Sequence, residues 1–132
     1  MTASITLQQQ VYFEDIDVSG VVHHPKYFNY FERARTTWLH QHGIDSQQLH
    51  DANCFFAIIH ANINYLKALR LDDHISITAD LKPCSAASVI FEQRIYQTQQ
   101  SDIINATAGI KIVTINHKAK AIRLPKALRE LL

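Results

Sequence analysis

The chain has 132 residues, of which 47% are hydrophobic and 19% charged, and its formal net charge at pH 7 is +1. This composition is typical of one globular domain with a sizeable core, and it excludes a disordered chain. The scattered Lys and Arg residues predict no nucleic-acid partner. There is no apolar run of membrane-spanning length and no signal-peptide pattern, so we expect one cytoplasmic domain over residues 1–132.

The first part of the chain predicts a strand followed by a long helix. Residues 5–13 alternate between apolar and polar side chains, which indicates a strand with one buried face. An acidic break over residues 15–20 follows, and Pro25 stands where the first turn of a helix accepts proline. Gly43 stands where a helix commonly ends. The helix between them should be central, because apolar side chains repeat along it at helical spacing: Tyr27, Phe31, Ala34 and Trp38.

The rest of the chain predicts mainly strands. A short helix over residues 46–51, with Ser46 as its cap, is expected first. Four segments rich in β-branched and aromatic residues follow, and a short helix closes the chain: strands 55–66, 74–82, 88–98 and 103–115, then helix 125–132. Turn-like breaks separate the strands at 71–73, 83–87 and 99–102. One long helix followed by hairpin-connected strands predicts an α+β fold, with an antiparallel sheet wrapped around the helix.

The stretch from Glu14 to Arg35 carries the chemistry. It passes from a strand end through two further acids, one glycine and two adjacent histidines into the long helix. The start of a helix offers unpaired backbone N–H groups and a positive dipole end, which favour a developing negative charge. Such a site can bind a carbonyl oxygen as it becomes an oxyanion, while a carboxylate activates water or attacks.

Residues 12–35 read Y-F-E-D-I-D-V-S-G-V-V-H-H-P-K-Y-F-N-Y-F-E-R-A-R. This string resembles the signature of hotdog-fold acyl-CoA thioesterases of the 4-hydroxybenzoyl-CoA thioesterase type, and in particular the bacterial branch associated with the Tol-Pal envelope system. His23 replaces the usual aromatic residue of that signature, and the resemblance continues through residues 63–73. The positions that match the family pattern are Asp15, Asp17, Gly20, Val21, Val22, His24, Tyr27, Glu32, Arg33, Ala34 and Arg35.

The resemblance implies a fold, an assembly and a reaction. The fold would be a five-stranded antiparallel sheet around the central helix, in homodimers or homotetramers with the active site at the dimer interface. Asp17 would be the catalytic carboxylate, and the backbone N–H of His24 would donate to the thioester carbonyl. Thioester hydrolysis needs no metal or cofactor, and we expect neither. Whether Asp17 acts as a general base or as a nucleophile stays open.

Several neighbouring side chains have candidate roles. The imidazole of His24 either helps to polarise the carbonyl or caps the helix start. Asp15 is interpreted as a structural acid that orients the turn. A metal site is not expected, because His40 and His42 would point to different faces of the helix. The candidate substrate-binding residues are Val22, His23, Tyr27 and Lys82.

The substrate is less well defined than the reaction. Relatives that act on aromatic acyl-CoA carry a basic cluster before the fourth strand that helps to hold the nucleotide phosphates, whereas the matching stretch here is the uncharged Ser85-Ala86-Ala87. Lys82, or the group of Lys118, Lys120 and Arg123, could replace it, or the affinity for the phosphates is instead weak. We therefore expect small or short-chain acyl-CoA substrates, with carrier-protein thioesters also possible. The alternative function is a hotdog binding or scaffold module for acyl carrier protein or envelope-associated partners.

Overall fold

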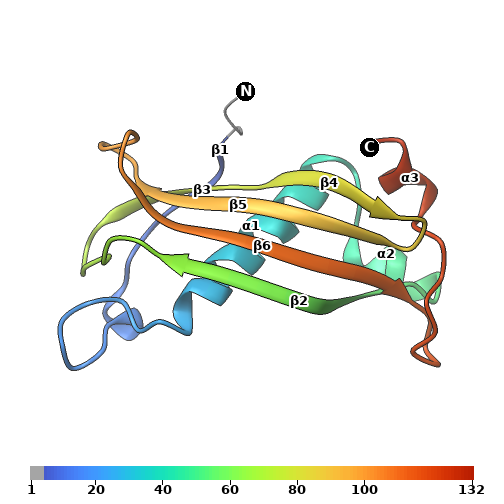
Figure 1. Ribbon diagram of the computed structural model, residues 1–132, viewed down its shortest axis with the longest axis horizontal. Coiled ribbons are helices and arrows are strands. Elements are labelled where there is room, and N and C mark those ends of the chain that lie inside the picture. The colour runs from blue at the N-terminus through green and yellow to red at the C-terminus, as the bar shows by residue number, and fades with distance from the viewer. Residues whose placement is uncertain (1–4) are drawn as a thin grey trace.

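The computed structural model describes residues 5–132, and in it a long helix lies across one face of an antiparallel sheet (Figure 1). Within this range the sheet has six strands, which pair in the order β1-β3-β5-β6-β2, with β4 also pairing with β5. The strands are β1 (Ile5–Gln10), β2 (Phe55–Tyr65), β3 (His74–Thr78), β4 (Asp80–Ser85), β5 (Ser88–Gln97) and β6 (Ile104–Ile115). The helices are α1 (Lys26–Gln41), α2 (Ser46–Asp51) and α3 (Lys126–Arg129). The α+β hotdog prediction is confirmed.

The core lies between α1 and the inner face of the sheet. Successive side chains of a strand point to opposite faces, so every second residue of β5 and β6 faces the helix. On β5, Phe91 and Ile95 are buried, whereas Glu92 between them is exposed. Burying a large apolar side chain of this kind stabilises the fold by about 1.5–3 kcal/mol. The helix contributes Tyr27, Tyr30, Phe31 and Ala34 to the same cluster.

The helix ends where the sequence predicts. Gly43 has φ of +77°, a conformation that glycine adopts without steric cost. Its N–H donates to the carbonyl of His40 at 3.0 Å, and the N–H of Ile44 donates to the carbonyl of Leu39 at 2.9 Å. These two bonds satisfy carbonyls that the helix would otherwise leave unpaired. The predicted cap of α2 is wrong by one residue, because the side chain of Asp45 accepts the N–H of Gln47.

Two predicted strands differ from the structure. The first strand ends at Gln10, and a short 3₁₀ turn over Phe13–Asp15 follows it. The predicted strand 74–82 is two strands, so that the sheet has six strands and not five. At the junction, the backbone N–H of Arg94 donates to the side-chain oxygen of Thr78 at 3.0 Å, which interrupts the regular ladder.

The predicted break over residues 83–87 is also shorter than expected. Pro83 lies within β4 and pairs with Val89 of β5. Proline is tolerated there because β4 has only one neighbouring strand, so a missing N–H need not break the ladder. The closing helix, predicted over 125–132, is α3 at Lys126–Arg129.

The long strand β2 forms an edge of the sheet. It pairs with β6 alone, so its other side has no strand partner within residues 5–132. Apolar side chains on it are exposed, including Ile58 at 52%, Ile59 at 55% and Tyr65 at 47%. A long edge strand with exposed apolar groups is a ready surface for pairing with another chain. None of the helices within residues 5–132 has the length and hydropathy to cross a bilayer.

Candidate active site

The acidic turn before α1 is a short hairpin closed by backbone bonds. Ile16 forms an antiparallel bridge with Val22, and the N–H of Asp17 donates to the carbonyl of Val21 at 2.9 Å. The hairpin reverses at Gly20, whose φ of +86° lies in the region that glycine favours. The turn therefore presents Asp17 near the start of the helix, as the sequence predicts.

The carboxylate of Asp17 is held on one side only. Its Oδ1 accepts the backbone N–H of Ser19 at 2.8 Å and also the Ser19 hydroxyl. Its Oδ2 accepts no hydrogen bond from residues 5–132. The Ser19 hydroxyl, followed by the Ser19 N–H, lowers the pKa of Asp17 below its ordinary value of 3.8. Asp17 is therefore an ionised carboxylate at neutral pH with one oxygen available to a ligand.

The start of α1 supplies an unused donor. The N–H of His23 donates to the carbonyl of Asp15 at 2.7 Å, and the N–H of Lys26 donates to the carbonyl of His23 at 2.9 Å. Pro25 has no N–H. Between these residues, the N–H of His24 has no acceptor among residues 5–132. This N–H lies at the positive end of the helix dipole and can bind a carbonyl oxygen that gains negative charge.

Aromatic rings surround His24. The ring of His24 lies edge-on to that of His23, with centroids 5.1 Å apart, and to that of Tyr65, at 6.3 Å. The ring of Tyr65 also lies edge-on to that of Tyr27, with centroids 5.0 Å apart, and the Tyr65 hydroxyl donates to the carbonyl of His24 at 3.3 Å. Tyr65 comes from the end of β2, so the edge strand and the helix start meet at this site. The rings of His23 and Tyr65 therefore both pack edge-on against the ring of His24 at the helix start.

The predicted site residues are brought together in part. Asp17 is half-buried, and His23 and His24 are exposed on the same turn. Val22 and Tyr27 belong to this junction but are each 4% exposed, so within one chain they pack in the core beneath it.

Lys82 lies apart from these residues. Its strand β4 is at the other end of the molecule from the blue turn that carries Asp17 (Figure 1). Its Nζ is 3.6 Å from the carboxylate of Glu92 on β5.

Sequence reasoning missed two residues of the site. Ser19 follows Asp17 by two positions, and an Asp-x-Ser string is a common turn in which the carboxylate accepts the later N–H, so a local signal for it existed. Tyr65 is separated from His24 by 41 residues. No local pattern identifies it, because its place depends on how the end of β2 meets α1.

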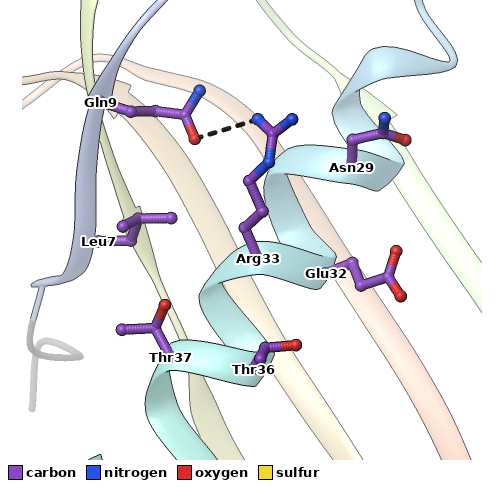
Figure 2. Close-up of a pocket in the computed structure, with 7 residues that line it drawn as sticks. All are labelled: Leu7, Gln9, Asn29, Glu32, Arg33, Thr36 and Thr37. Carbon is purple, nitrogen blue, oxygen red and sulfur yellow. Dashed lines mark hydrogen bonds between the residues drawn. The ribbon is translucent and has the colours of Figure 1, made fainter. Parts of the chain in front are cut away.

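A cavity of about 470 Å³ opens between α1 and β1 (Figure 2). The guanidinium of Arg33 points across it towards β1, and its Nη1 donates to Oε1 of Gln9 at 3.4 Å. The cavity is lined by Leu7, Gln9, Asn29, Glu32, Arg33, Thr36 and Thr37. Neither Asp17 nor His24 contributes to its wall, so the cavity is distinct from the turn.

The fold and the turn define a class of protein. The sequence of residues 11–132 matches the model of the thioesterase-like superfamily, and the chain belongs to this family. It is 31% identical over 119 residues to the acyl-CoA thioester hydrolase YbgC of Escherichia coli O157:H7, a match that covers 90% of this chain and 88% of that protein. It is also 34% identical over 117 residues to the long-chain acyl-CoA thioesterase FadM of Escherichia coli, covering 87% and 86%.

Solved structures agree with this placement. A probable thioesterase from Bartonella henselae superposes with a TM-score of 0.84 at 31% identity, covering 90% of this chain and 97% of that one. A 1,4-dihydroxy-2-naphthoyl-CoA thioesterase from Synechocystis has a TM-score of 0.88 at 23% identity, covering 95% and 92%, and supports the fold alone.

Proposed function

We propose that this protein is an acyl-CoA thioesterase in which Asp17 and the backbone N–H of His24 act on opposite sides of the thioester carbonyl. The observation that carries the proposal is made at the start of α1: among residues 5–132, one oxygen of an ionised carboxylate and one helix-start N–H both have no hydrogen-bond partner. The names of the relatives support the same substrate class. Acyl-CoA is a cytoplasmic metabolite, so we propose that the protein acts there.

Two routes fit this arrangement, and in both the oxyanion accepts a hydrogen bond from the N–H of His24. In the first, Asp17 takes a proton from water, the hydroxide adds to the carbonyl carbon, and the C–S bond breaks. The departing thiolate then takes the proton from Asp17. In the second, the carboxylate of Asp17 attacks the carbonyl carbon and expels the thiolate, and water opens the resulting mixed anhydride.

We propose further that two chains share the site. The edge strand β2 ends at Tyr65, whose ring contacts His24, so a second chain paired along β2 would border the turn. Such pairing would cover the exposed side chains of Ile58 and Ile59, and it would give hydrogen-bond partners to the backbone N–H and C=O groups on the open edge of β2. We propose a dimer of this kind, or a tetramer made of two such dimers.

For the phosphates of coenzyme A we favour the basic hairpin of residues 116–123 over Lys82. The side chain of Asn116 accepts the N–H groups of Lys118 and Lys120 at 2.9 and 3.1 Å, which orders the hairpin. Lys118, Lys120 and Arg123 form no ion pair within residues 5–132, whereas Lys82 is 3.6 Å from the carboxylate of Glu92.

The position of the basic hairpin also suits a shared site. Phe55, at the start of β2, pairs with Ile115, just before the hairpin, while the His24 site is at the other end of β2. Antiparallel pairing of two β2 strands would bring the hairpin of one chain towards the Asp17 turn of the other. The long pantetheine arm of coenzyme A requires such a separation between the thioester and the phosphates.

For the acyl group we propose a small or short chain. The ring of Tyr65 lies beside that of His24 and packs edge-on against the buried ring of Tyr27, and a large acyl group at the helix start would meet it. One relative is named for long-chain substrates, so chain length is the property to measure. Thioesters carried by acyl carrier protein offer the same bond and belong in the same experiment.

The test is thiol release from a panel that runs from acetyl-CoA to palmitoyl-CoA and includes acetyl-loaded acyl carrier protein. We expect kcat/KM to be highest for the short acyl-CoAs and to fall to background in Asp17→Ala. If wild type cleaved no member of the panel faster than Asp17→Ala, the chain would be a binding module and not a thioesterase.

A further inference from the structure

Asp15 is a buried carboxylate at the base of the active-site turn. It is 3% exposed, and its Oδ2 accepts both the backbone N–H of Tyr12 at 3.1 Å and the hydroxyl of Tyr30 at 2.8 Å. Its own carbonyl oxygen accepts the N–H of His23 at 2.7 Å. One residue therefore ties together the chain before the turn, the middle of α1 and the residue that precedes the unused N–H of His24.

Tyr30 is the only side chain of α1 that donates a hydrogen bond to this turn within residues 5–132. It is fully buried, and burial, followed by its bond to Asp15, raises the pKa of its phenol above the ordinary 10.0. The phenol is therefore protonated and donates to Asp15 at any working pH. Lys26 places a positive charge near Asp15, because its partly exposed Nζ is 4.0 Å from Oδ1.

The connection from Asp15 to the reactive groups is short. Asp17 follows two residues later, directly after Ile16, which forms a backbone bridge with Val22. His24 follows directly after His23, which Asp15 holds. A shift of Asp15 relative to α1 would therefore move both groups that act on the thioester.

We propose that Asp15 and Tyr30 are positioning residues that fix the Asp17 turn and the N–H of His24 relative to α1. This inference rests on the proposed function of the turn. Neither side chain contacts the substrate in this proposal. A misplacement of about 1 Å of a catalytic group can cost a hundredfold in rate, so a hydrogen bond remote from the carbonyl can control turnover.

The test is Tyr30→Phe, which removes only the hydroxyl and keeps the ring in the core. We expect kcat to fall roughly tenfold to a hundredfold, with KM changing less than about twofold. The control is Ile77→Val, a loss of one buried methylene on β3, away from the turn. Assays run well below the melting temperature of both variants should show a wild-type kcat for Ile77→Val. This should hold even if the two variants have equal melting temperatures.

A second variant tests the coupling without relying on Tyr30→Phe alone. Asp15→Ala removes the oxygen that accepts from both Tyr12 and Tyr30. If the pair acts as a unit, adding Tyr30→Phe to Asp15→Ala should lower kcat much less than it does in wild type. Independent, multiplying effects would overturn the inference, and so would a wild-type kcat in Tyr30→Phe.

Different results would contradict the thioesterase proposal and the positioning proposal. If Asp17→Asn abolishes turnover and Tyr30→Phe does not change it, the positioning role is wrong and the thioesterase proposal stands. If Asp17→Asn turns over like wild type, the turn is not the catalytic site, and the positioning role falls with it.

Discussion

Asp15 and Asp17 are two residues apart and have opposite surroundings. Asp15 is buried, and its carboxylate is used by Tyr12 and Tyr30 of the same chain. Asp17 is half-buried, and Ser19 occupies only one of its oxygens. A carboxylate can act on a substrate only through an oxygen that the protein leaves free. The hydrogen-bond partners therefore favour a structural role for Asp15 and the proposed reactive role for Asp17.

The bonds from Ser19 predict the pH dependence. In the proposed mechanism the carboxylate form of Asp17 is the active one, so activity should be present above its pKa and be lost as the pH falls through that value. Ser19→Ala removes the hydroxyl donor, which is the largest cause of the lowered pKa. The acidic limb of the kcat/KM profile should therefore move to higher pH, towards 3.8, while Ser101→Ala in the exposed β5–β6 turn leaves it in place. An unmoved limb in Ser19→Ala would contradict the assignment of that limb to Asp17.

Gln93 predicts a large effect on stability. It is 2% exposed, donates to the carbonyls of Phe31 at 3.0 Å and Thr78 at 3.3 Å, and accepts from Nη1 of Arg35 at 3.1 Å. Burial lowers the pKa of Arg35, because a buried guanidinium loses the solvation of its charge. Gln93→Leu leaves these groups unpaired, so the free energy of unfolding should fall by about 2–4 kcal/mol. Urea denaturation of Gln93→Leu and of the exposed control Gln99→Leu measures this loss of stability. Equal free energies of unfolding for the two variants would contradict the prediction.

At the scale of elements, the end of α1 depends on one glycine. Gly43 has positive φ, and an added Cβ would meet no atom within 4 Å, so only backbone strain opposes a side chain there. Gly43→Ala should lower the free energy of unfolding by about 1 kcal/mol and leave kcat unchanged. Thermal melting together with thiol release checks both parts. A variant as stable as wild type would show that the helix end tolerates strain.

The elements also show what the sequence could predict. The long helix and the Asp17 turn could be predicted, because Gly43, Pro25 and the apolar spacing are local signals. The division between β3 and β4 could not, because it depends on the side chain of Thr78 bonding to Arg94 across the sheet. The place of Tyr65 beside His24 is likewise a tertiary contact that no local pattern contains.

At the scale of the whole molecule, the edge strand β2 predicts the assembly. Ile59 is 55% exposed on this strand, and a lysine there opposes edge-to-edge pairing. Ile59→Lys should sediment as a monomer and lose at least about tenfold in kcat, because in the proposed dimer a second chain borders the site. Ile103→Lys, at the exposed β5–β6 turn, should keep both properties. An Ile59→Lys monomer with full activity would contradict the shared site.

The most direct test of the account is the turnover of Asp17→Asn on the best short acyl-CoA. The amide keeps the size of the carboxylate and can still accept from Ser19, so the melting temperature should stay close to that of wild type. Without a basic or nucleophilic oxygen, kcat should fall by at least about a hundredfold. A folded Asp17→Asn enzyme with wild-type kcat would show that thioester cleavage does not depend on this carboxylate.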